Sequence, residues 1–280
     1  MTRRPRHSMH KYFHQKYDLW SKYDQGIRMD RESWYSCTPE KIAKQISERC
    51  DHFYNKDNRK SNENKTKSVI IDAYCGTGSN AIQFAITHFD YVIAIDINEK
   101  KIAMAQWNAQ VYGVSDKIEF ICGDIFEVMH ILQMRFRQSN NEKIQAIYMS
   151  PPWGGPAYID QPVYQIDQIP GILGLMQKCR QLTANIVVYL PRNITIRGTV
   201  DLGSSSTEEC YCIEYFTPQK WKVKAIAVYF FGDRQLDCSK SEGNENSPHL
   251  TSITNEIQKY ILKKAVDVQV NKKAQFGYSK

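Results

Sequence analysis

The sequence predicts an α/β fold: a mostly parallel, seven-stranded sheet that ends in an antiparallel hairpin and is preceded by a small helical extension. From Ser68 onward, short apolar runs alternate with segments of helical periodicity, which is typical of a parallel sheet with helices on both faces. The last two apolar runs, 210–216 and 223–231, are separated by a short segment that suits a hairpin. A chain of 280 residues is long enough for one such core with extensions.

The composition divides the chain into four parts. Residues 1–54 form a basic, helical extension, 55–67 a polar linker, 68–233 the core, and 234–280 a polar and basic tail in which a helix is predicted over 251–265. The net charge is +7, and lysine and arginine gather toward both ends. Basic ends favour a polyanionic partner, of which nucleic acid is the commonest.

Two helices are predicted in the extension. Aromatic and basic residues mix over 8–22, which indicates a helix that docks on another surface. A second helix is predicted to start at Thr38, because threonine can cap a helix, Pro39 suits the first helical position and Glu40 lies near the positive end of the dipole.

The core elements follow in order. The predicted strands are 69–73, 91–95, 118–122, 144–149, 185–190, 210–216 and 223–231. Helices are predicted from about residue 80, over 99–112 and over 125–135, and a long connection joins the fourth strand to the fifth.

Other protein classes are disfavoured. The eight cysteines show no C-x-x-C spacing that would hold zinc, and no secretory signal peptide precedes them. The apolar stretches are too short to cross a bilayer. We therefore expect a soluble intracellular protein with no metal, no membrane contact and no apolar stripe that would require an oligomer, hence a monomer.

A glycine-rich turn follows the first strand, and acidic residues end the first three. Gly76 and Gly78 lie four and six residues after Asp72, and Asp96 and Asp124 follow the next two strands. A carboxylate at Asp96 can accept both ribose hydroxyls of a nucleoside, and Asp124 can accept from an adenine amine or simply cap the next helix. The turn lacks a third glycine, so a dinucleotide fits less well than S-adenosylmethionine, whose sulfonium and amino groups are cationic.

The fourth strand ends in a rigid corner, residues 150–154, with the sequence Ser-Pro-Pro-Trp-Gly. Proline fixes φ and lacks a donor, so Ser150 and the Pro151 carbonyl can face an exocyclic amine while a base stacks on Trp153. The alternative is a proline turn that only ends a strand. Beside a methyl donor, this corner indicates a methyltransferase that acts on a planar amine.

These motifs resemble the trimethylguanosine synthases, which hypermethylate the 7-methylguanosine cap of small nuclear and nucleolar RNAs. The segments that carry the resemblance are 11–13, 23–27, 34–43, 72–78, 80–85, 94–96, 150–156 and 190–193. The resemblance implies a class I (Rossmann-like) methyltransferase fold, S-adenosylmethionine as cofactor, and 7-methylguanosine-capped RNA as substrate. It also implies a nuclear protein, in the nucleolus or nuclear bodies, that can occur in the cytoplasm too.

The resemblance also implies roles for residues outside the two motifs. Trp20, Ser36 and Thr38 of the extension would join Asp72, Asp96 and Asp124 at the donor. Lys11 and Arg192 would reach the cap triphosphate, since arginine binds phosphate with two parallel hydrogen bonds.

Two other functions stay open at this point. The first is a methyltransferase for an internal RNA base, at guanine N2 or adenine N6, because the corner suits any exocyclic amine. The second is a module that binds a cap or RNA without catalysis. The pair Lys11 and Arg192 favours a cap over an internal base, and intact Asp96 and Trp153 favour an enzyme over a module.

Overall fold

The computed structural model describes residues 13–54, 66–203, 211–217 and 223–231. The chain divides into two units, 1–234 and 235–280, and the second lies outside the described residues, as do Lys11, most of the predicted linker and the predicted helix over 251–265. The division into four parts stays a prediction.

A seven-stranded sheet has the strand order β3-β2-β1-β4-β5-β7-β6. Its strands are β1 (Lys67–Asp72), β2 (Tyr91–Asp96), β3 (Ile118–Cys122), β4 (Glu142–Met149), β5 (Asn185–Pro191), β6 (Tyr211–Phe216) and β7 (Ala225–Phe231). The first five run parallel, and β7 pairs antiparallel with both β5 and β6. The predicted parallel sheet with a closing antiparallel hairpin is confirmed.

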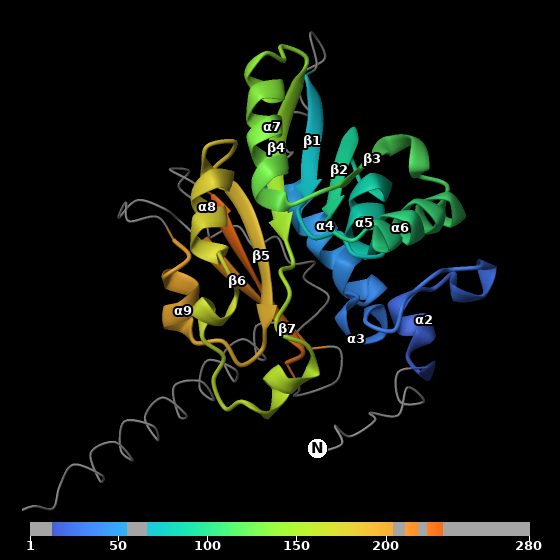
Figure 1. Ribbon diagram of the computed structural model, residues 1–280, viewed down its shortest axis with the longest axis vertical. Helices are drawn as coiled ribbons and strands as arrows, with labels where there is room; N and C mark the ends of the chain where they lie inside the picture. Colours follow the sequence, from blue (N-terminus) through green and yellow to red (C-terminus); the bar gives the residue numbers. More distant parts are fainter. Residues whose placement is uncertain (1–12, 55–65, 204–210, 218–222, 232–280) are drawn as a thin grey trace, which may run out of the picture. The chain divides into compact units, whose positions relative to one another are not determined.

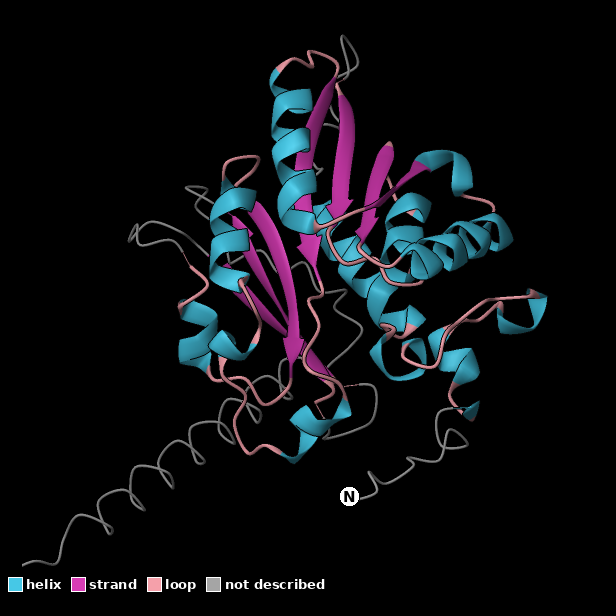
Figure 2. Ribbon diagram, in the orientation of Figure 1, coloured by secondary structure: helices cyan, strands magenta, loops and turns pink. Residues whose placement is uncertain are grey.

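Helices cover both faces of the sheet, as Figure 1 shows: α7 and α8 lie in front of it, and α4 and α5 lie behind. The longer helices are α4 (Glu40–Tyr54), α5 (Ser79–Ile86), α6 (Glu99–Tyr112), α7 (Ile125–Arg137) and α8 (Ile172–Arg180). The arrowheads of β1, β4 and β5 point toward the side where the extension lies (Figure 2). Ligands of parallel α/β sheets bind at this carboxyl edge.

Two predictions about helices were wrong or incomplete. Instead of one continuous helix through residue 22, the described part of that segment has a turn at 14–15 before α2 (Lys16–Leu19), and α2 ends at Trp20, which is extended and buries its indole. The long connection after β4 contains α8, and α9 (Ile196–Val200) follows β5. The spacing of Ile172, Leu175, Met176 and Cys179, all buried, marks α8 as an amphipathic helix that sequence analysis missed.

Candidate active site

The glycine turn after β1 is shaped by two residues with left-handed backbone. Gly76 has φ 53° and Gly78 has φ 93°. A Cβ atom on Gly78 would lie 3.2 Å from the Cβ atom of Ala105 in α6, so the turn packs tightly against that helix. The amino end of α5 follows directly; Gly78 is buried, and Gly76 is partly exposed.

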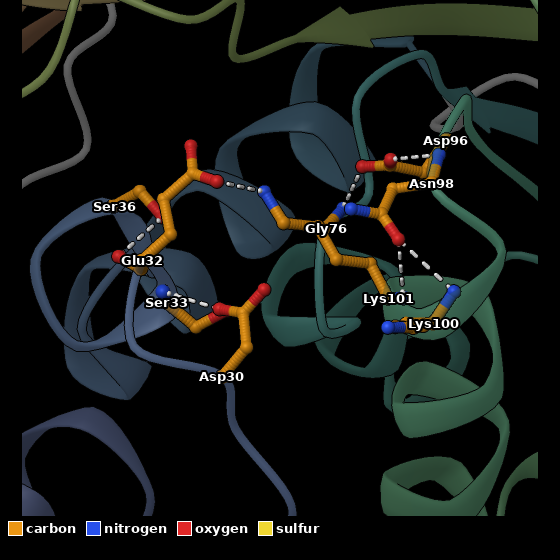
Figure 3. A network of polar contacts seen from close by, with 9 residues as sticks. All are labelled: Asp30, Glu32, Ser33, Ser36, Gly76, Asp96, Asn98, Lys100 and Lys101. Atoms are coloured by element: carbon orange, nitrogen blue, oxygen red, sulfur yellow. Dashed lines mark hydrogen bonds and ion pairs between the residues drawn. The ribbon is translucent and has the colours of Figure 1, made fainter.

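Asp96 fixes the same turn from the end of β2. One carboxylate oxygen accepts from the Gly76 N–H at 3.0 Å and the other accepts from the Asn98 N–H at 2.8 Å. Figure 3 shows this carboxylate beside Gly76, with the Asn98 side chain turned to cap α6 through Lys100 and Lys101. Asp96 is partly exposed, so its remaining lone pairs can face a ribose.

Asp124 performs the structural role that sequence analysis left open. It is the N-cap of α7 and accepts from the Phe126 N–H at 2.8 Å. The contact of Asp124 with an adenine amine stays a prediction. The other two acids end strands β1 and β2, and all three lie at one edge of the sheet.

Asp72 differs from the other two acids because it is fully buried. Neither of its carboxylate oxygens hydrogen-bonds to a residue that the structure describes. Burial raises the pKa of Asp72 to about 7, although the nearby N–H groups of Tyr74 and Ala81 favour its ionised form. A buried carboxyl group without partners is stabilised when a cation binds beside it.

The extension is bound to the donor turn through Thr38. The Thr38 carbonyl accepts from the Ser79 hydroxyl at 2.6 Å, and the Thr38 hydroxyl accepts from the Asn80 amide at 3.0 Å. Both partners belong to the first turn of α5, which follows Gly78. Thr38 is therefore held against the amino end of α5, beside the glycine turn, and its contact with a donor stays a prediction.

The other two predicted extension residues are placed differently. Trp20 is 1% exposed, donates its indole N–H to the Met29 sulfur and packs on Tyr112. Ser36 is exposed, and its hydroxyl donates to the Glu32 carbonyl. Both lie in the same part of the extension, but their contact with a donor stays a prediction.

Sequence analysis missed the clamps between the extension and α6. Asn108 is fully buried; its amide donates to the carbonyls of Arg28 and Thr77, and its oxygen accepts from the Arg28 N–H. The Glu32 carboxylate reaches Lys101 at 3.1 Å (Figure 3). Such pairs depend on chain segments about 70 to 80 residues apart, and no local spacing marks them.

The acceptor corner lies one strand away from Asp72, since β4 pairs with β1. Trp153 is partly exposed and packs against Tyr189 of β5 and Tyr158, with ring centroids at 5.4 Å and 5.2 Å. Its buried indole N–H makes no hydrogen bond to the described residues. Pro151 is buried, while Ser150 is partly exposed and can face a ligand.

Of the two residues predicted to bind the cap triphosphate, the structure describes Arg192, and Lys11 lies outside the described residues. Arg192 is exposed and directly follows β5. The next residue, Asn193, donates its amide to the carbonyls of Tyr158 and Gln161, in the segment that follows the acceptor corner. Lys224, which sequence analysis did not select, is an exposed residue near Asp18 and Cys37; partial desolvation lowers the pKa of its ammonium group, and the Asp18 carboxylate opposes this shift.

A family model described as RNA cap guanine-N2 methyltransferase matches residues 67–233. The chain belongs to this family. Its matched region contains the donor turn, the three acids and the acceptor corner.

Two yeast proteins and one solved structure resemble this cap methyltransferase. The trimethylguanosine synthase of Schizosaccharomyces pombe is 34% identical over 80% of this chain and 86% of its own length. That of Saccharomyces cerevisiae is 33% identical over 65% of this chain and 54% of its own length. The human methyltransferase 10 domain containing protein shares the fold, with a TM-score of 0.52, 10% identity, and coverage of 80% of this chain and 98% of that one.

The enzyme is therefore an S-adenosylmethionine-dependent RNA cap guanosine-N2 methyltransferase with a class I fold. The site fits this cofactor, because Asp72 offers a buried carboxyl group that makes no hydrogen bond to the described residues, and Asp96 is partly exposed beside the glycine turn. When bound, the cofactor supplies a methyl group on a sulfonium ion.

The described part of the chain contains neither a candidate metal-binding group nor a helix that could cross a membrane. Its His, Cys, Asp and Glu side chains form no group of three or more that could hold a metal ion. Each of its helices is too short or too polar to cross a membrane.

Proposed function

We propose that this enzyme methylates the 7-methylguanosine cap of small nuclear and nucleolar RNAs and carries the reaction through to 2,2,7-trimethylguanosine. The observation that supports this most is Trp153, partly exposed between Tyr158 and Tyr189 and three residues after Ser150. A 7-methylated guanine is cationic, so an indole attracts it more than neutral guanine, by about 1 to 2 kcal/mol when desolvated. Prior methylation at N7 would then be required.

In this proposal the acceptor corner orients the guanine N2 amine. The Ser150 hydroxyl or the Pro151 carbonyl accepts from the amine, and Trp153 stacks on the base. The N2 lone pair is delocalised into the ring, so catalysis comes mainly from alignment, which can supply about 7 to 11 kcal/mol. The proton leaves after transfer and needs no strong base.

The donor site would use both the core and the extension. Asp72 would be the counter-ion of the donor's ammonium group, Asp96 would accept from the ribose hydroxyls, and Asp124 from the adenine amine. The remaining proposed donor contacts are Trp20, Ser36, Thr38, Gly76 and Gly78. Because Asp72 would be engaged by a cation, it is not assigned as a general base.

Lys11 and Arg192 would bind the triphosphate of the cap, Lys11 as a mobile charge and Arg192 through paired hydrogen bonds. We infer further that the enzyme acts as a monomer in the nucleus. The basic extension, 1–54, would work with the core, 68–233.

The test is methyl transfer from labelled S-adenosylmethionine to a 7-methylguanosine-capped dinucleotide, an unmethylated cap and an uncapped RNA, with the product nucleosides identified by mass. We expect label only on the 7-methylated cap, at N2, and a dimethylated final product. Label on the uncapped RNA would favour an internal base instead, and a single added methyl would limit the product to 2,7-dimethylguanosine. Donor binding without label would point to a binding module.

A further inference from the structure

Tyr148 lies where the donor and acceptor halves of the site meet. It is the second-last residue of β4 and pairs in register with Asp72 of β1. Residues opposite each other on paired parallel strands point to the same face of the sheet, so Tyr148 and Asp72 share a face. On that face the Tyr148 ring packs on Phe84 of α5, with ring centroids at 5.4 Å.

The hydroxyl of Tyr148 is fully buried and makes no hydrogen bond to the residues that the structure describes. Burial raises the pKa of Tyr148 well above the ordinary value, and the charge of Asp72 raises it further, so the hydroxyl stays protonated. The side chains of Thr38 and Ser150 also lie close enough to the hydroxyl to act on it as hydrogen-bonding groups. A buried hydroxyl without a partner destabilises a fold, and phenylalanine would fill the same space without that penalty. Folding alone therefore does not explain this oxygen.

The neighbours of the hydroxyl define what it can do. Thr38 belongs to the extension and is already bound to the donor turn through Ser79 and Asn80. Ser150 belongs to the acceptor corner. A serine oxygen accepts well from an amine only if its own O–H is directed elsewhere, and a tyrosine oxygen can accept that O–H while donating its own.

We propose that Tyr148 is a positioning residue for methyl transfer: in the substrate-bound enzyme Ser150 donates to the Tyr148 hydroxyl, which donates to Thr38. This chain leaves the lone pairs of Ser150 directed at the guanine N2 amine. The inference rests on the proposed function, in which Ser150 accepts from that amine. It also ties the acceptor group to the extension, so both halves of the site share one hydrogen-bond chain.

The test is Tyr148→Phe, assayed for methyl transfer to the 7-methylguanosine-capped dinucleotide. We expect kcat to fall about five- to tenfold, the range for one lost hydrogen bond, while KM for both substrates stays within about twofold. The melting temperature should stay the same or rise. The matched control is Tyr54→Phe. The Tyr54 hydroxyl is buried outside the proposed site and donates to the Phe230 carbonyl over 3.1 Å. Its removal should lower the melting temperature without changing kcat.

A double-mutant cycle with Ser150→Ala shows whether Tyr148 acts through Ser150. Tyr148→Phe should have no further effect on kcat once Ser150 is alanine, and additive losses would overturn the proposal. Wild-type kcat in Tyr148→Phe, or a loss of kcat together with a lowered melting temperature, would also overturn it. Weaker donor binding by calorimetry would assign the hydroxyl to the donor instead. If the wild-type enzyme forms no N2-methylated product, the proposed function itself fails, which is a separate result.

Discussion

The two ends of the proposed active site, a ribose end around Asp96 and a transfer end around Tyr148, differ in how many of their polar groups have hydrogen-bond partners. At the ribose end, Asp96 accepts from Gly76 and Asn98, and Lys101 pairs with Glu32. At the transfer end, Asp72, Tyr148 and Trp153 carry buried polar atoms that make no hydrogen bond to the described residues. The ribose end also has one such atom, the Thr77 hydroxyl of the glycine turn. Unmatched buried groups destabilise a fold, so we infer that ligands complete the transfer end, while the ribose end is largely held by its own hydrogen bonds.

This comparison separates two kinds of variant. Changes at the transfer end should alter binding and turnover more than folding, because the groups there have few partners to lose. Changes at the ribose end should alter the conformation of the glycine turn that contains Gly76 and Gly78. The four predictions below test this division from the largest expected effect to the smallest.

Trp153→Ala should lower methyl transfer to the capped dinucleotide at least about 100-fold. The variant removes base stacking, which contributes about 1 to 3 kcal/mol, together with the attraction between an indole and a cationic base. Donor affinity, measured by calorimetry, should stay within about twofold because the proposed donor contacts lie on the extension and at the ends of β1, β2 and β3, not on the acceptor corner. Trp153→Phe is the control and should retain part of the activity. Unchanged activity in the alanine variant would remove the stacking role.

Gly78→Ala should weaken donor binding about 10- to 50-fold. A left-handed residue with a side chain costs about 1 to 2 kcal/mol, and here the new Cβ atom would also meet Ala105 at 3.2 Å. The control is Gly113→Ala, which also has positive φ but no atom within 4 Å of the new Cβ. Gly113→Ala should lower the free energy of unfolding through backbone strain alone and leave donor affinity unchanged. Equal donor affinity in both variants would show that the turn tolerates the crowding.

Asp72 should make donor binding and stability depend on pH in opposite directions. Its pKa in the folded protein is raised to about 7, against about 3.9 in an unfolded chain. The protonated group contributes stability that is fully present below about pH 4 and is lost as pH rises through 7. Between pH 6 and 7 the free energy of unfolding should fall by about 1 kcal/mol, while donor affinity rises about fivefold as the carboxylate forms.

Asp72→Asn tests this pH dependence because asparagine does not titrate. Urea unfolding of the variant without donor should lose the decrease between pH 6 and 7, and calorimetry should show weak donor binding with no rise over that interval. Slopes equal to those of the wild type would assign the titration to another group and remove Asp72 as the counter-ion.

The sequence predicted the sheet and the strand-end residues well, since both follow from local patterns. Apolar runs mark the strands, and Asp72, Asp96 and Ser150 directly follow or end them, so their shared edge follows from parallel pairing. The roles of these residues remain proposals. Helix α8 had a readable apolar spacing, but Gly171 and Gly174 at its start obscured it.

The clamps of the extension could not be predicted in the same way. Asn108 and Arg28 are 80 residues apart, and neither has a local pattern that selects the other. The missing hydrogen bond of the Tyr148 hydroxyl depends on the packing of Thr38 and Ser150, which belong to different parts of the chain. Long-range packing decides such features, and one sequence contains no direct signal for it.

Glu32→Gln should have the smallest effect, about a twofold loss of donor affinity. It removes the charge that pairs with Lys101 beside the ribose end, but the Glu32 side chain is 49% exposed, and pairs this open contribute at most about 1 kcal/mol. The matched control is Glu48→Gln, which breaks the exposed pair with Lys44 on α4 and should leave donor affinity unchanged. A tenfold loss in Glu32→Gln would mean that the ion pair orders the extension over the donor, and that the ribose end also needs completion.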